Sequence, residues 1–424
     1  MRSVYRAMAA GLALGVGLVA GASTARAGGL WVYETASPDV GTASAGRAAL
    51  ANDASTAFSN PAGMTRTGTQ LLFGLQPTIV TTEFDRGTGT TIDGTNGGNA
   101  GGLLPAGAFY GVYKVNDDLA VGAAFHSYAG GALDYETNWV GRYLTTEAAL
   151  VTLTFGPSVA YRVLPWLSLG VGFDIQWAKV KNELAINNRL ESLPDGFMKY
   201  EDNNFGFGGN VGALFEIDEQ TRVGVTYRSQ VDHGFSDVPS FGQLGPGLEA
   251  ALRRAGVLGA SLGLDTTIPQ EVMLSLYRDV TDDLAVMANF NWQDWSQFGE
   301  FTVSLSTVPP KARALDTNLS GTYQGAFGIH YRLGEPTTLL LGVAYDSSPA
   351  TEANRSPALP LDGQMRFAGG VQYDVNKDYT IGAAYEYASL GSANIDVTRP
   401  AGRVQGDYQT NSLNVFSLTV IRRF

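Results

Sequence analysis

Between residues 68 and 424, short turns and long connecting segments alternate strictly along the chain. The six short turns are clusters of turn-forming residues at 115–118, 164–166, 218–220, 281–283, 334–336 and 376–378. The seven long segments lie near 83–101, 134–147, 182–203, 233–264, 302–320, 346–363 and 392–406. This order of breaks predicts fourteen strands, with the turns gathered at one end and the long loops at the other.

The segments between the breaks alternate apolar residues with polar or small ones. In 167–177 an apolar residue occupies every second position, and 284–293 and 323–333 repeat the pattern. Alternation over about 10 residues suits a wall between lipid and a polar lumen. We therefore predict an all-β protein, a transmembrane antiparallel β-barrel of about 14 strands, whose closure leaves no exposed strand edge.

The composition supports a large β-structure. Hydrophobic residues make up 44% of the chain, which contains 53 Gly, 19 Tyr, 20 Phe and no Cys. After residue 27 there is no apolar run of about 18 residues, so no membrane helix is expected. The absence of Cys excludes a disulfide framework and thiolate chemistry.

The chain begins like an exported protein. Arg2 and Arg6 precede the small apolar residues 7–22, and Ala25-Arg26-Ala27 fits a leader cleavage site. We interpret 1–27 as a signal peptide rather than a membrane anchor, because the apolar run is short. Its removal takes three of 28 basic residues and none of 40 acidic ones, so nucleic acid is not an expected partner.

Residues 28–67 do not alternate and are rich in Ala, Ser, Gly and Thr. Such small residues suit packing inside a lumen, where irregular backbone is tolerated. The segment carries little charge and includes apolar Trp31, Val32 and Phe58. We predict an N-terminal plug, or hatch, over 28–67, followed by the barrel over 68–424; the alternative is a disordered periplasmic tail.

The phase of the alternation places several cations inside the barrel. Arg228, Arg366 and His126 are candidate ligand-binding residues, because a lumenal cation can hold a ligand carboxylate through charge-assisted hydrogen bonds. The same phase points four more basic side chains inward: Arg162, Arg222, His330 and Arg332. For any single residue, the favoured alternative is pairing with a lumenal Asp or Glu. Arg228 ranks first because it is expected near the middle of the barrel.

The two longest loops are expected at 182–203 and 233–264. Within the second, residues 246–260 predict an amphipathic helix with Leu248, Leu252 and Leu258 on one side. An exposed apolar helix indicates capture of a hydrophobic ligand, with packing as a lid over the barrel mouth as the alternative.

Enzymatic motifs are absent. The three histidines form no metal-spaced pair, and neither H-E-x-x-H nor G-x-S-x-G occurs. We expect no catalytic residue, no metal and no cofactor.

Several motifs resemble the FadL/TodX family of outer-membrane transporters for long-chain fatty acids and other hydrophobic compounds. Residues 41–46 and 53–64 are similar to the hatch of that family, with Asn60-Pro61-Ala62 as the most specific motif. Further similarity lies at 156–161, 225–229 and 292–296, and in the terminal Phe424. The resemblance covers nearly the whole mature chain.

The resemblance implies a mechanism without an energy source. Asn60, Pro61, Ala62 and Gly63 would belong to a hatch that gates the barrel. Ligand would be captured by the loops, bind in the lumen and leave sideways through a gap at an inward kink in the third strand. That strand is expected at 119–133, with the kink at Ala129-Gly130-Gly131; an ordinary transition from strand to loop is the alternative.

We therefore predict a bacterial outer-membrane protein, a monomer surrounded by membrane lipid or detergent, that passes hydrophobic small molecules. Long-chain fatty acids are the favoured substrate. Monoaromatic hydrocarbons are an alternative that the sequence does not separate from them. A general diffusion porin or an adhesive barrel is disfavoured, because neither needs an N-terminal plug.

Overall fold

The computed structural model describes residues 32–188, 192–307, 311–316 and 318–424. The expected signal peptide and residues 28–31 lie outside this part of the chain. The described strands of the barrel form one antiparallel sheet of fourteen staves that closes where β1 (Gln70–Arg86) pairs with β21 (Gly402–Arg423). The prediction of a closed fourteen-strand barrel is thus confirmed.

The staves follow the chain in order. After β1 come β2 (Leu103–Lys114), a third stave in two pieces, β3 (Leu119–His126) and β4 (Gly130–Asp134), then β5 (Glu147–Leu164), β6 (Leu167–Ile186), β7 (Gly196–Glu216) and β8 (Thr221–Arg228). The others are β12 (Glu271–Asp279), β13 (Leu284–Gln293), β16 (Thr322–Arg332), β17 (Thr337–Asp346), β18 (Gln364–Asp374), β19 (Tyr379–Ser389) and β21.

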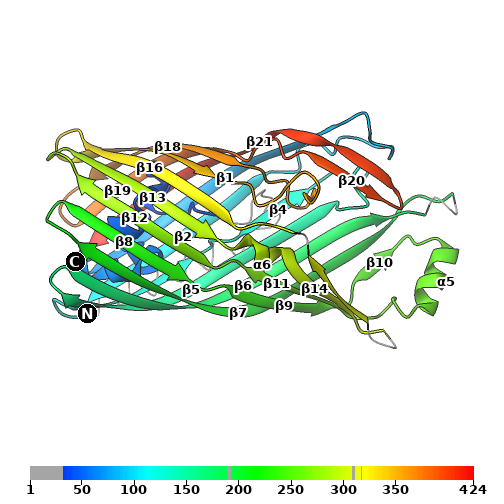
Figure 1. Ribbon diagram of the computed structural model, residues 1–424, viewed down its shortest axis with the longest axis horizontal. Coiled ribbons are helices and arrows are strands. Elements are labelled where there is room, and N and C mark those ends of the chain that lie inside the picture. Colours follow the sequence, from blue (N-terminus) through cyan, green and yellow to red (C-terminus); the bar gives the residue numbers. More distant parts are fainter. Residues whose placement is uncertain (1–31, 189–191, 308–310, 317) are drawn as a thin grey trace.

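The six short turns lie where the sequence places them, at the end of the barrel opposite the long loops (Figure 1). Asn and Asp side chains fix their geometry by accepting from backbone amides. Asn116 Oδ1 accepts from the amides of Asp118 (2.9 Å) and Leu119 (2.8 Å). Asn376 repeats this arrangement before β19. These Asx turns join neighbouring antiparallel strands.

The alternation sorts side chains between lipid and lumen. On β6, Phe173 is 49% exposed on the outer wall, whereas Asp174 is 1% exposed inside. Polar residues inside and a band of exposed aromatic and aliphatic residues outside are the arrangement of a membrane-spanning barrel. Among the described residues, no helix is long and apolar enough to cross a membrane.

Residues 32–67 lie inside the barrel. They form η1 (Pro38–Thr42), α2 (Arg47–Leu50), α3 (Thr56–Ser59), η2 (Pro61–Gly63) and α4 (Met64–Thr67), all short turns of helix. Nearly all their side chains are buried, and the segment contacts strands around the barrel, from β2 and β3 to β18 and β19. We call residues 32–67 the hatch.

The long loops add structure beyond the barrel rim (Figure 1). A second sheet has the order β15 (Lys311–Asp316), β14 (Glu300–Leu305), β11 (Leu262–Ile268) and β9 (Val231–Asp237). The remaining loop elements are β10 (Ser240–Gly242), α5 (Pro246–Arg254), α6 (Trp295–Gly299) and β20 (Ile395–Arg399). The rim that carries these loops is the extracellular one by the usual asymmetry of such barrels.

Two expected boundaries are wrong. Residues 182–203 are mostly strand, since β6 continues to Ile186 and β7 begins at Gly196. Cross-strand ion pairs such as Lys199–Glu183 (2.7 Å) link the two strands of this extended hairpin. The helix expected over 246–260 ends at Arg254, because Gly256 adopts a positive φ of 69°.

Candidate functional site

The third stave is interrupted at Ser127, Tyr128 and Ala129. The last pair of β3 joins His126 to Thr154 of β5, and the first pair of β4 joins Gly130 to Val151. Four steps along the third stave therefore face three steps along β5, which is a bulge of one residue. Gly130 accommodates it with a φ of 155°.

The bulge coincides with a gap in the pairing of the wall. β2 pairs with β3 only from Phe109 to Lys114, whereas its other edge pairs with β1 from Leu103 onwards. Residues 103–108 of β2 thus have no partner strand on the side of β4. The predicted kink residues Gly130 and Gly131 lie in β4, directly after the break, so the chain resumes as a strand there and does not enter a loop.

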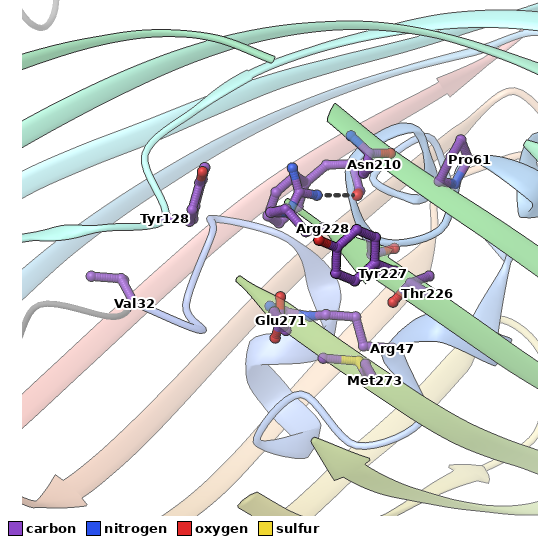
Figure 2. A pocket seen from close by; sticks show the side chains of 12 residues that line it. Val32, Arg47, Pro61, Tyr128, Asn210, Thr226, Tyr227, Arg228, Glu271 and Met273 are labelled. Carbon is purple, nitrogen blue, oxygen red and sulfur yellow. Dashed lines mark hydrogen bonds between the residues drawn. The ribbon is translucent and has the colours of Figure 1, made fainter. Parts of the chain in front are cut away.

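A pocket lies between the hatch and the lumenal wall beside this break. Its lining includes Arg47 and Phe58 of the hatch, Tyr128 at the break, and Arg228, Asn210 and Glu271 on the wall (Figure 2). In this state the pocket has room for roughly one water molecule. A larger occupant requires movement of the hatch.

Arg228 is the central cation of the pocket and is 5% exposed. Its Nη1 forms an ion pair with Asp174 of β6, and its Nη2 donates to the carbonyl oxygen of Phe58 at 2.8 Å. The guanidinium carbon lies 4.2 Å from the ring centre of Phe58 and 5.2 Å from that of Tyr128. In this conformation Arg228 is therefore paired with a lumenal Asp, which is the alternative that the sequence analysis favoured for any single lumenal cation.

His126, at the end of β3, belongs to the same assembly. It is buried, and its ring centre lies 3.9 Å from that of Phe58 and 5.7 Å from that of Tyr128. Tilted ring contacts at these distances pack the hatch against the strand break.

Arg366 does not line this pocket. It lies on β18 among three carboxylates: Nε is 3.1 Å from Glu34 of the hatch and 3.4 Å from Glu386, and Nη1 pairs with Asp346. All four side chains are at most 8% exposed. One guanidinium with three acids binds the hatch to β17, β18 and β19.

Other predicted basic residues also contact the hatch or the turns. Arg222 donates to the carbonyl oxygens of Ala49 (3.1 Å) and Leu50 (3.0 Å) at the end of α2. Arg162 donates to Thr65 at 3.2 Å, while Arg332 reaches the carbonyl oxygen of Asp282 in a turn. These cations satisfy backbone carbonyls that helix and turn ends leave without partners.

The Asn60-Pro61-Ala62-Gly63 motif is fully buried. Asn60 Nδ2 donates to the carbonyl oxygens of Ala48 (2.6 Å) and Ala213 of β7 (3.1 Å), and its Oδ1 accepts from the Ala62 amide (3.1 Å). Pro61 is the first residue of η2, where its fixed φ suits a helix start. The motif joins two turns of the hatch to the wall.

Sequence reasoning missed a set of glycines on the lumenal wall. Each lies where the hatch approaches so closely that a Cβ would meet a hatch atom, backbone or the Asn60 side chain, at 2.3 Å or less. The five are Gly74, Gly170, Gly212, Gly224 and Gly342. Glycine at an inward position of several strands was the available signal, since ordinary inward positions carry side chains that fill the lumen.

The loop helix α5 carries the predicted leucines at the extracellular rim. Leu248, Leu252 and Leu258 are each half-buried, and no residue of α5 is fully buried. Leu258 lies outside the helix, after the turn at Gly256. The three leucines lie beyond the barrel, apart from the lumenal pocket.

Among the residues that the structure describes, no group of three His, Cys, Asp or Glu could hold a metal ion.

The chain forms a closed outer-membrane barrel. The hatch fills its lumen, and its third stave is interrupted. These features define the class of protein as a plugged outer-membrane channel.

The family follows from comparison with known proteins. The family model described as outer membrane protein transport protein (OMPP1/FadL/TodX) matches residues 18–424. The chain belongs to this family, whose members are outer-membrane transport proteins and not enzymes. Its location is the bacterial outer membrane.

Curated relatives cover most of the chain. Outer membrane protein P1 of Haemophilus influenzae is 27% identical, with 88% of each chain covered. The long-chain fatty acid transport protein of Escherichia coli K12 is 25% identical, covering 95% of this chain and 94% of its own.

Two solved structures share the fold. A Pseudomonas aeruginosa FadL homologue has a TM-score of 0.85 at 22% identity, covering 93% of this chain and all of its own. The Pseudomonas putida toluene transporter TodX has a TM-score of 0.68 at 16% identity, with 94% and 100% covered.

Proposed function

We propose that this protein carries long-chain fatty acids across the outer membrane passively, by capture at the loops, binding in the lumen and exit sideways into the bilayer. The observation that carries the proposal is the break in the third stave. Residues 103–108 of β2 lack a partner strand beside β4, and the pocket around Arg228 and Tyr128 lies at that point. A wall opening next to a lumenal pocket gives a hydrophobic ligand a route that avoids water.

The hatch favours this function over general diffusion. Residues 32–67 occupy the lumen and are held by Asn60, Arg228 and Arg366, so no open aqueous path is needed or offered. A porin requires a water-filled channel. Movement of Asn60-Pro61-Ala62-Gly63 away from β7 would be the gating step in our proposal.

The choice of fatty acids rests on two supports. Relatives named for long-chain fatty acid transport align over nearly their full length, and the FadL homologue from P. aeruginosa superposes more closely than the toluene transporter. In our proposal Arg228 then holds the ligand carboxylate, with His126 and Tyr128 against its chain. The leucines at 248, 252 and 258 would meet the ligand first, outside the cell.

Monoaromatic hydrocarbons are the second candidate. Arg228 and Arg47 are each already paired with an aspartate. Both guanidinium groups of the pocket thus have a carboxylate partner before any ligand arrives. An uncharged ring needs none. Similarity to the fold of a toluene transporter is compatible with this branch.

Uptake separates these candidates. Transport-deficient cells that express the protein would be given radiolabelled oleate or toluene, with deletion of residues 60–62 as the control for the hatch. Hatch-dependent uptake of oleate is the expected result. Toluene uptake without oleate would assign the aromatic branch, and leakage of sugars with uptake of neither would replace the proposal with a porin.

A further inference from the structure

We infer that Arg422, on the outer wall of the barrel, binds the phosphate group of a membrane phospholipid at the seam where the barrel closes. Arg422 lies near the end of β21, opposite Leu71 of β1 on one side and Tyr379 of β19 on the other. A lipid held there contacts the first and last staves together. The site lies outside the lumen, so it does not depend on the transported ligand.

The alternation of β21 places the Arg422 side chain on the lipid-facing wall. Leu418 and Val420 are 57% and 43% exposed, whereas Thr419 and Ile421 are buried. Arg422 follows Val420 by two residues and therefore lies on the same face. Because the outward series is apolar up to Val420 and charged at Arg422, this arginine lies at the border of the hydrocarbon region.

This border belongs to the periplasmic side of the membrane. The Arg423 amide donates to the carbonyl oxygen of Asp378 at 2.8 Å, so β21 ends beside the short turn at 376–378. The short turns lie at the end of the barrel opposite the long loops, which is the periplasmic end (Figure 1). The periplasmic leaflet of a bacterial outer membrane consists of phospholipids, and their phosphate groups lie just beyond the hydrocarbon region. The Arg422 guanidinium is thus at the depth of these phosphates.

Two aromatic rings hold the guanidinium without using its donors. The guanidinium carbon of Arg422 lies 4.4 Å from the ring centre of Phe424 and 5.6 Å from that of Tyr379. A cation near the face of a ring is attracted by the ring quadrupole, and this contact requires no N–H group. The rings therefore position the side chain before a ligand arrives, which lowers the entropy lost on binding.

The neighbouring arginine shows what a fully engaged side chain looks like at this rim. Arg423 Nη1 donates to Thr380 Oγ1 at 2.8 Å and lies 3.7 Å from Asp374. In the part of the chain that the structure describes, the Arg422 guanidinium forms neither an ion pair nor a hydrogen bond. Its N–H fork is therefore available, and that fork matches two oxygens of a phosphate group. Lipid phosphates are the anions that a basic residue meets at a membrane border.

Lipid binding to the purified full-length protein, measured by native mass spectrometry, tests the site. The probes are phosphatidylglycerol and a galactosyl diacylglycerol with the same acyl chains, which differ in the phosphate group. We expect the parent protein to bind phosphatidylglycerol about fivefold more tightly than the galactolipid, and Arg422→Gln to bind the two lipids equally. Phosphatidylglycerol should also raise the melting temperature of the parent protein more than that of Arg422→Gln, because the bound lipid stabilises the closed seam.

Two further variants locate the effect. Arg422→Lys keeps the charge but lacks the planar fork, so it should retain only part of the preference for phosphatidylglycerol. Arg399→Gln is the matched control: Arg399 is exposed on β20, among the long loops at the other end of the barrel, and its replacement removes the same charge. The preference of this control should equal that of the parent protein.

Three results would overturn the inference. The first is an undiminished preference for phosphatidylglycerol in folded Arg422→Gln, or in Arg422→Lys if only that variant folds. The second is displacement of the lipid by millimolar inorganic phosphate, which would make Arg422 a site for small anions. The third is a reduced amount of folded barrel in the outer membrane of cells that express Arg422→Gln, with an unchanged lipid preference in the purified variant. That result would assign Arg422 to the assembly of the barrel.

Discussion

The side-chain amide of Asn60 donates to the carbonyl oxygen of Ala48 at 2.6 Å, which ties α2 to the start of η2 within the hatch. The same nitrogen reaches Ala213 on β7 at 3.1 Å. One side chain thus holds the hatch together and holds it to the wall. Both carbonyls are backbone groups that need a donor when buried.

We expect Asn60→Ala to loosen the hatch by about 1–3 kcal/mol, because two buried carbonyls and the Ala62 amide lose their partner. The measurement is single-channel conductance in planar bilayers, in which brief openings should become more frequent. Asn60→Asp is the matched variant: it keeps the acceptor for the Ala62 amide, loses the donor and adds a carboxyl group at the buried site. If the single-channel traces of the parent protein, Asn60→Ala and Asn60→Asp are equally closed, the role assigned to Asn60 is refuted.

A second prediction concerns the lumenal glycines. A Cβ on Gly224 would lie 1.9 Å from the Ala48 carbonyl oxygen, so Gly224→Ala must displace α2 from β8. We expect a lower melting temperature and a raised basal conductance. Gly325→Ala is the control on another strand, since nothing lies within 4 Å of the position of its Cβ. If both variants behave like the parent protein, the hatch backbone does not rest on the wall at Gly224.

The barrel was predictable because its signals are local. Alternation between positions two apart, and Asn or Asp at the turns, place each strand without knowledge of its partners. The extension of β6 and β7 was missed because one face of the hairpin carries charged residues, such as Lys181, Glu183 and Lys199, in place of the apolar residues of a membrane-facing strand.

The site was only partly predictable because its contacts join distant residues. Phase alone places Arg228 and Asp174 in the lumen, but their ion pair depends on the register of β6, β7 and β8. The Arg366 cluster likewise joins Glu34 to residues more than 300 positions away. The one-residue bulge before Gly130 exists only relative to β5, so residues 127–131 alone suggest a flexible turn and do not define the gap.

A third prediction concerns the aromatic cluster under the extracellular loops. Trp139 is fully buried, stacks on Tyr135 with ring centres 4.0 Å apart and donates to the Thr145 carbonyl oxygen at 2.8 Å. Truncating it to Ala should cost about 3–5 kcal/mol of local stability. Limited proteolysis of intact cells should then cleave within 134–147, while the barrel strands stay protected.

Trp166→Ala is the control for that experiment, because this tryptophan is 50% exposed at a short turn of the barrel. Protection of the loop in both variants would mean that the Trp139 cluster does not hold the loops. Cleavage in both would point to a general loss of the fold.

The last prediction is a pH dependence of the extracellular sheet. His233 on β9 is 1% exposed and lies 3.0 Å, through Nε2, from Gln176 Oε1. Burial lowers the pKa of His233 to about 4, below its ordinary value of 6.5. The unfolded or opened segment therefore takes up a proton below pH 6.5 that the closed segment refuses down to about pH 4. Stability from this residue is full above pH 6.5 and falls as the pH decreases through that window.

At pH 5 the loss is about 1–2 kcal/mol relative to pH 7. Amide hydrogen exchange of 231–237, corrected for its intrinsic pH dependence, should show easier opening at pH 5 in the parent protein. In His233→Gln, which does not titrate and can still bond to Gln176, the difference between the two pH values should disappear. Persistence of the difference in that variant would show that His233 does not govern the opening of β9.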